Sequence, residues 1–296
     1  MKRLVMIATL LMLLGLTSQG IAAQDASPAA EGSPSTALLD GLGYPALSVV
    51  YDGSAITMAD TLEAGRYLLD FSNTSGSEPQ IATFLGATDD HPVDEILTAL
   101  QSVDPAQGPP PIYYQIKVSG LTESGQQSVI TLTPGDWLFL VVGDSGPAIA
   151  QFTVTGEMPE YDAIADAVNV DLHEMAIDMP DTIPAGDHIW QVENTGSFVH
   201  FIQVMKVTGP ITDAEVVNAL ALEMGGPGAT PVESGSVGDP STFTPAAGSG
   251  DFSNGLTQLV EANLEPGTYV AFCFLSGPGD VGMHAMQGMY KIFTVE

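Results

Sequence analysis

Basic side chains are scarce in this sequence. Six Lys and Arg residues stand against 36 Asp and Glu residues, which gives a formal net charge of −30. Charged residues make up only 14% of the chain, against about a quarter in average proteins, so the acidity comes from missing bases rather than from extra acids. A field of this sign repels nucleic acid and anionic membranes and favours a cation or a basic protein partner. We therefore expect no nucleic-acid partner.

Cysteine is almost absent. Cys273 is the only one, so the chain cannot form an internal disulfide. A lone thiol in an oxidising compartment is a liability unless it is buried or bound to a metal. A buried structural cysteine is the common case, and the residues around Cys273 weaken that interpretation.

Long apolar runs are missing beyond the N-terminus. A basic start at Lys2 and Arg3 precedes an apolar run from Leu4 to Leu16, and small residues follow up to Ala23. This order predicts a secretory signal peptide over residues 1–23, with a run too short for a comfortable membrane span. We expect an exported mature chain, either secreted, periplasmic or at the cell surface, that is not inserted in a membrane. Removal of the signal would leave four basic residues and a net charge of −32.

The remaining chain divides by composition. Residues 24–43 are small, polar and rich in proline, which predicts a disordered linker. Two domain-sized stretches follow, 44–156 and 168–296, joined by an acidic linker over 157–167. The stretch 224–254 is rich in Gly, Pro, Ser and Thr, and we predict a long surface loop there, either a mobile lid or an insertion.

The two long stretches share segments in the same order, which indicates an internal repeat. Ala55–Gly65 parallels Ala176–Gly186 without a gap, and Pro134–Val142 parallels Pro266–Phe274. An Asn-Thr pair after a strand-like run, a helix candidate and a closing Phe-Thr-Val also recur in both copies.

The helix candidates are Asp94–Leu100 and Thr212–Leu220. Thr212 and Glu215 have the spacing of a capping box. The rest consists of short β-rich runs broken by turn residues, which indicates a sandwich or barrel. We therefore predict an all-β protein of two tandem β-sandwiches, each with a short helix insertion.

Four candidate metal ligands lie in the second copy. Cys273 lies near the end of a strand-like run, and a glycine-rich loop leads to His284 and then Met289. His200 lies in another strand-like run upstream. Two His, one Cys and a weak axial Met are the ligand set that suits copper in electron transfer. If the two strands face each other inside the sandwich, His200 and Cys273 meet at one end and the loop folds back over them.

The first copy provides an internal comparison. His200 aligns with Gln80, and Cys273 aligns with Val141. The loop that carries His284 and Met289 is shortened in the first copy and has neither residue. Unrelated core residues have no reason to vanish together, so the four residues are predicted to form one site, present in the second copy only.

The second copy resembles the cupredoxins, the type 1 (blue) copper proteins. The shared pattern is a strand His, then Cys-x10-His-x4-Met, read here at His200, Cys273, His284 and Met289. The resemblance implies Greek-key sandwiches, with two His and the Cys holding one copper ion in a trigonal plane and Met as the axial ligand. The Cys–His spacing is longer than in small blue copper proteins. His200 is followed by Phe201, where plastocyanins and azurins carry an Asn that braces the cysteine loop.

The neighbours of Cys273 argue against an enzyme. Multicopper oxidases and copper nitrite reductases place His beside this Cys, whereas here Phe272 and Phe274 flank it, and the chain has no His-x-His pair. We expect single-electron transfer to a redox partner, which the charge suggests is basic. The alternatives are a Cu(I) carrier, which would also use Met283 and Met286, and a metal-free binding module. The remaining histidines, His91, His173 and His188, are not expected to be ligands.

Overall fold

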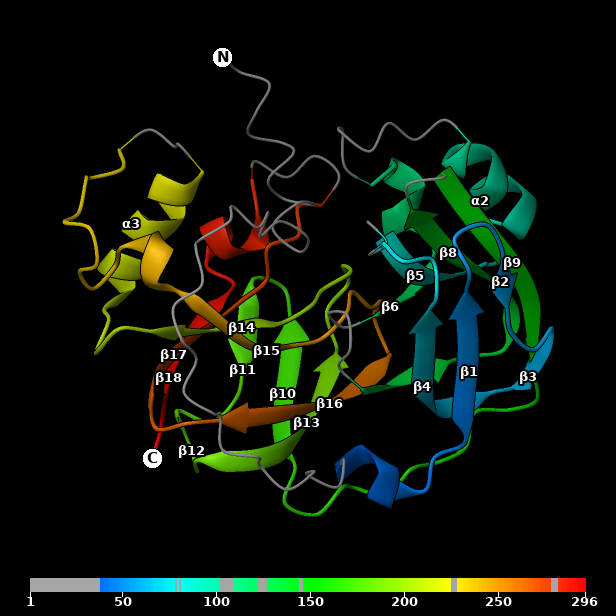
Figure 1. The fold of residues 1–296 in the computed structure, drawn as a ribbon, viewed down its shortest axis with the longest axis horizontal. Coiled ribbons are helices and arrows are strands. Elements are labelled where there is room, and N and C mark those ends of the chain that lie inside the picture. Colours follow the sequence, from blue (N-terminus) through cyan, green and yellow to red (C-terminus); the bar gives the residue numbers. More distant parts are fainter. Residues whose placement is uncertain are drawn as a thin grey trace.

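The structure is a computed structural model that describes residues 38–77, 79, 81–101, 109–121, 127–143, 146–224, 228–277 and 282–296. The chain forms two β-rich halves that lie side by side (Figure 1). The predicted signal peptide and most of the predicted N-terminal linker lie outside the described residues. Among the described residues, no helix is long and apolar enough to span a membrane.

Each half contains its own five-stranded sheet, and the two sheets have the same order of equivalent strands. In the first half the order is β3 (Thr61–Glu63), β9 (Gly146–Thr155), β8 (Gly135–Gly143), β5 (Ile81–Gly86) and β6 (Lys117–Gly120). In the second half it is β12 (Thr182–Ile183), β18 (Tyr290–Val295), β17 (Gly267–Phe272), β14 (Gln203–Val207) and β15 (Thr244–Gly248). The predicted repeat is therefore a repeat of topology as well as of sequence.

The remaining strands join into one eight-stranded sheet that runs through both halves. Its order is β11 (Ala176–Asp178), β10 (Val168–His173), β13 (Gly186–Asn194), β16 (Thr257–Leu264), β7 (Ser128–Leu132), β4 (Gly65–Asn73), β1 (Ala46–Tyr51) and β2 (Ile56–Thr57). The halves meet where β16 pairs antiparallel with β7, with Leu259 opposite Val129 and Val260 opposite Ser128. This join was not anticipated from the sequence, because the repeat indicated two separate sandwiches.

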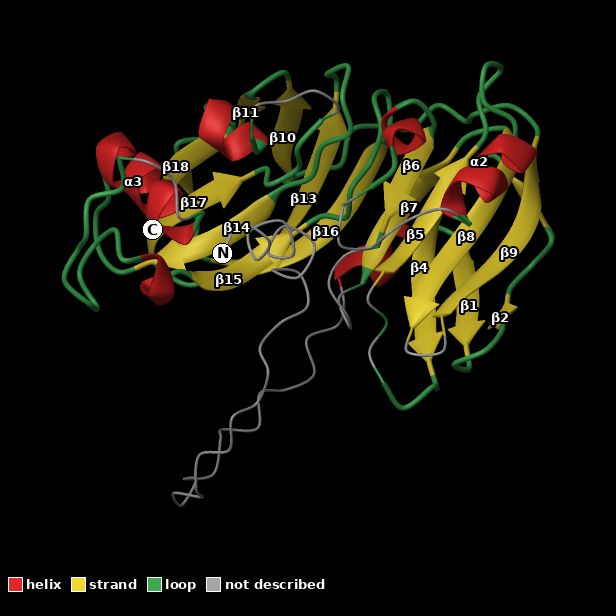
Figure 2. Cartoon of the chain, turned by 90° about the horizontal axis from the view of Figure 1, so that it is seen from above, coloured by secondary structure: helices red, strands yellow, loops and turns green. Residues whose placement is uncertain are grey.

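Both halves pack apolar side chains between their sheets, and Figure 2 shows the strand layers from above with the helices at the periphery. The first core includes Trp137, Phe139 and Phe84. The second includes Trp190, Phe293 and Cys273. The prediction of an all-β protein of two sandwiches is confirmed.

The predicted helices are present. They are α2 (Val93–Leu100) and α3 (Asp213–Glu223), accompanied by the short 3-10 turns η3 (Pro111–Tyr114), η4 (Pro240–Thr242) and η5 (His284–Gln287). Thr212 and Glu215 form the predicted capping box, in which each side chain bonds the backbone amide of the other residue.

Two sequence predictions are corrected. The linker predicted over 24–43 is wrong at its end, because η1 (Leu38–Leu42) is a 3-10 turn whose buried Leu39 packs on Val129 and Leu259. The loop predicted over 224–254 is wrong from Thr244 onward, because β15 pairs there with β14. Pro is tolerated in an edge strand, which has one unpaired side, so the composition of β15 concealed a strand.

Candidate metal centre

The structure brings His200, Cys273 and His284 together in the second half. The Cys273 sulfur lies 3.8 Å from Nδ1 of His200 and 3.6 Å from Nδ1 of His284, and the two nitrogens are 3.2 Å apart. All three side chains are completely buried. His nitrogen and Cys sulfur are the atoms through which these side chains bind metals, so the three form a triangle of donor atoms.

The size of this triangle fits one metal ion at its centre. In protein zinc sites, metal–nitrogen bonds are about 2.0 Å and metal–sulfur bonds about 2.3 Å. A trigonal plane with bonds of that length would separate the nitrogens by about 3.5 Å and each nitrogen from the sulfur by about 3.7 Å. The three separations in the structure lie within about 0.3 Å of these values. The residues present therefore fit the metal that the sequence predicts.

Met289 lies at the same place in the core. Its side chain is completely buried in the same cluster as Cys273. Its backbone accepts from the Cys273 amide at 3.2 Å and donates to the His284 carbonyl at 2.9 Å. The turn η5 ends at Gly288, whose left-handed φ of 110° favours glycine. The chain can therefore turn sharply between His284 and Met289.

The backbone around His200 is fixed from one side by Phe252. The two residues exchange both main-chain hydrogen bonds, at 3.1 and 2.9 Å. His200 precedes β14, so it belongs to an isolated bridge rather than to the regular ladder. The ring of Phe198 lies edge-on to His200 and is tilted against His284.

The thiol of Cys273 is held by backbone amides. Burial raises the pKa of this thiol to about 12, while hydrogen bonds from the amides of Phe201 and Leu275 act in the opposite direction. Amides that point at sulfur favour the thiolate, the form that binds metal. Phe201 contributes through its main chain, so the absence of an Asn side chain at this position does not leave the sulfur without donors.

Burial and the nearby His284 lower the pKa of His200 to about 4. The imidazole is therefore neutral near pH 7, which is the form that binds metal. Nε2 of His200 is buried without a hydrogen-bond partner.

Asn194 positions the site but was not singled out from the sequence. Its buried side-chain amide donates to the carbonyls of Phe198 and Phe252, at 2.8 and 2.7 Å, and its oxygen accepts from the Gly196 amide. It therefore holds both backbone segments beside His200. The signal was the repeated Asn-Thr pair, since Asn73 makes the same local contacts in the first half.

The other histidines lie outside this triangle. His91 contacts Gln115 and Glu95, and His188 contacts the Pro184 carbonyl. His173 forms a second group of potential ligands with Asp171 and Asp178 on the β10–β11 hairpin, partly exposed to solvent. Among the described residues, these two groups are the ones with three possible donors within 4.8 Å, and both belong to the second half.

Comparison with known proteins gives structural matches alone. No family model and no curated protein matches the sequence. The chain is similar to reduced auracyanin from Roseiflexus castenholzii, with 23% identity over 45% of this chain and 99% of that one, at a TM-score of 0.28. Auracyanin A, a blue copper protein from Chloroflexus aurantiacus, matches with 20% identity over 44% of this chain and 99% of that one, at a TM-score of 0.25. A multicopper oxidase matches with 12% identity over 84% of this chain and 87% of that one, at a TM-score of 0.23.

These TM-scores are low, so the class of the protein rests on its own strand topology and donor atoms. The chain has the cupredoxin fold in two tandem copies. Its second copy carries His200, Cys273, His284 and Met289 in a cluster typical of a type 1 copper site.

Proposed function

We propose that this protein transfers single electrons through one type 1 copper ion bound by His200, Cys273, His284 and Met289. The observation that carries the proposal is the buried donor triangle, whose dimensions fit a trigonal metal plane. Copper bound there would supply a centre that changes between Cu(II) and Cu(I). The residues of this chain bury the donor atoms away from solvent and hold them in fixed positions. The donor atoms therefore move little when the charge on the metal changes.

Two features of the site favour a resident copper ion over a Cu(I) carrier. The three donor atoms belong to side chains with no exposed surface, and backbone contacts hold each of them in place. A carrier must exchange its ion with a partner, which requires accessible ligands. Of the two extra methionines that a carrier would use, Met283 is buried and Met286 is 42% exposed.

No enzymatic role is proposed. Phe272 and Phe274, rather than His, flank Cys273 in the sequence, so no imidazole beside the cysteine connects the triangle to a second metal. We infer export from the basic, apolar and small-residue order of residues 1–23. The redox partner is inferred to be basic because of the net charge of −30. Electron-transfer rates that do not change with ionic strength would contradict a charged partner.

The test is the visible and EPR spectrum of the protein after one equivalent of Cu(II). An intense visible charge-transfer band with narrow copper hyperfine splitting is expected. Cys273→Ser should abolish the band, and His284→Gln should weaken or shift it. His188→Gln is the matched control, since it removes an imidazole outside the triangle. Binding of Cu(I) alone would favour the carrier, and Cys273→Ser protein with unchanged copper affinity would disprove the site.

A further inference from the structure

The first half of the molecule reaches the strand of His200 through main-chain pairing. β6 is one of the two edge strands of the five-stranded sheet in the first half, and Ser119 in β6 forms an antiparallel bridge with Phe252. The amide of Ser253 donates to the Val118 carbonyl at 3.0 Å. Phe252 in turn pairs with His200. Two isolated main-chain bridges, Ser119–Phe252 and Phe252–His200 (the Phe252 bridges), therefore connect the first half to a candidate copper ligand.

The contact is close enough to require glycine on both sides. A Cβ atom on Gly250 would lie 2.3 Å from the Gly120 carbonyl oxygen, and one on Gly120 would lie 2.8 Å from the Asp251 nitrogen. The buried side chain of Gln258 spans the two backbones, since it accepts from the Gly250 amide at 3.0 Å and donates to the Gly120 carbonyl at 2.9 Å. Such pairing at contact distance fixes the position of the second segment relative to the first.

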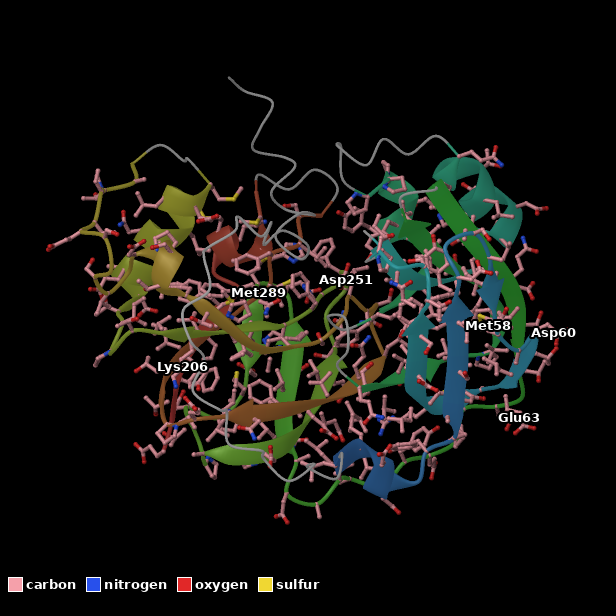
Figure 3. All side chains as sticks on the ribbon, in the orientation of Figure 1. Met58, Asp60, Glu63, Lys206, Asp251 and Met289 are labelled. Atoms are coloured by element: carbon pink, nitrogen blue, oxygen red, sulfur yellow. The ribbon has the colours of Figure 1, made fainter. Side chains whose placement is uncertain are left out.

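A tyrosine of the first half stabilises the segment that forms the Phe252 bridges. The hydroxyl of the buried Tyr113 donates to the Asp251 carboxylate at 2.7 Å. Loss of solvent raises the pKa of Asp251, and a carboxylate in this environment needs its donor. Figure 3 places Asp251 between Met289 and the first half.

The segment after Cys273 is held from the first half as well. The Tyr114 hydroxyl donates to the Ser276 carbonyl. Leu275 and Val199, from the second half, pack into an apolar cluster built mainly from the first half, with Tyr113 among its members. Val199 directly precedes His200, and the amide of Leu275 bonds the Cys273 sulfur. Contacts from the first half therefore reach both backbone segments that present copper ligands.

We propose that the first half of the molecule positions the ligands of the copper centre. Tyr113 and Tyr114 are the positioning residues, and they hold the backbone segments of His200 and Cys273 in place. This inference rests on the proposed function, because it concerns the same centre. It gives the copy without this ligand set a specific role, which is to set how tightly and in what geometry the other copy binds copper.

The test compares Tyr113→Phe, Tyr114→Phe and their combination in the full chain. Each change removes one hydroxyl and keeps the ring. The double variant should bind copper about ten-fold more weakly, the lower end of the effect known for residues that orient metal ligands, with altered hyperfine splitting. Tyr67→Phe is the matched control, since its buried hydroxyl bonds the Glu63 carbonyl inside the first half, and it should bind copper as the wild type does. Equal affinity in the double variant, or equal weakening in Tyr67→Phe, would overturn the proposal.

A second measurement needs no copper. Amide hydrogen exchange at His200 and Phe252 in the copper-free protein should be faster in the double variant and unchanged in Tyr67→Phe. Unchanged exchange in the double variant would overturn the positioning role of the first half, even if copper binds as proposed. If the wild-type protein binds no copper, the proposed function fails. Faster exchange in the double variant would still support the role of the first half in holding the His200 segment.

Discussion

At the scale of single residues, Nε2 of His200 is a buried nitrogen of the candidate site that has no hydrogen-bond partner. When Nδ1 faces a metal, Nε2 carries the hydrogen and needs an acceptor. A Cβ atom on Gly196 would lie 3.1 Å from both this Nε2 and the Oε1 atom of Glu174. Glycine thus leaves open the space between the imidazole and a carboxylate.

Glu174 is therefore expected to lower the reduction potential of the copper centre. A hydrogen bond from the Ser197 amide lowers the pKa of Glu174, so this carboxyl is ionised at neutral pH. A nearby negative charge favours Cu(II) over Cu(I). Glu174→Gln should raise the potential by about 20–60 mV, equivalent to about 0.5–1.4 kcal/mol. Glu223→Gln, which removes an exposed charge at the end of α3, should leave the potential measured by voltammetry unchanged.

His200 also predicts a pH dependence for the copper-free protein. Its pKa is about 4 in the folded chain and about 6.5 when unfolded. The unfolded state therefore binds more protons between these values, and stability is lost as the pH falls from 6.5 towards 4. Protonation of His200 accounts for at most about 3 kcal/mol of this loss of unfolding free energy.

The measurement is the unfolding free energy of the copper-free protein from denaturant titrations at pH 7 and pH 4.5. His200→Gln removes the titrating group, so the loss of stability between the two pH values should be smaller in this variant. An identical loss in both proteins would contradict the assignment of the pH dependence to His200.

At the scale of secondary-structure elements, the two helices begin in different ways. α3 has a capping box from Thr212, whereas α2 begins after Pro92 without a side-chain cap. Thr98 in α2 bonds the Asp94 carbonyl four residues earlier, a contact that contributes little to helix stability.

Thr212→Ala should therefore lower the unfolding free energy by about 1 kcal/mol, since it leaves the Glu215 amide in the first turn of α3 without its side-chain partner. Thr98→Ala is the matched control and should leave the unfolding free energy nearly unchanged. Chemical denaturation of both variants tests the difference. A Thr212→Ala protein as stable as the wild type would show that water replaces the cap at no cost.

At the scale of the whole molecule, the two copies meet through equivalent strands. β7 of the first half and β16 of the second follow each other in the eight-stranded sheet and pair antiparallel. Equivalent surfaces that contact each other are typical of a two-fold symmetric dimer. Here the two copies belong to one chain, and the predicted ligand set lies in the second copy alone.

The shared sheet predicts that both halves unfold together. Separate sandwiches would give two transitions, but a continuous sheet and the Phe252 bridges make the stability of each half depend on the other. Calorimetry of the copper-free protein should give one transition, with equal calorimetric and van't Hoff enthalpies. Two resolved transitions would show that the halves are independent and that the contacts between them are weak.

The sequence by itself determined the internal repeat, the two helices and the identity of the candidate ligands. Local residue patterns are sufficient to predict the internal repeat, the capping box at Thr212 and the strand-like runs around His200 and Cys273. The four candidate ligands were found because the second copy contains them and the first does not. This comparison needs only the sequence.

Only the tertiary structure decided how the copies meet and what holds the site. The pairing of β7 with β16, the Phe252 bridges and the contact of Tyr114 with Ser276 join residues more than 50 positions apart. The edge strand β15 was hidden by its own Gly and Pro content. Main-chain hydrogen bonds use groups that every residue except proline carries, so no residue pattern predicts which distant segments pair.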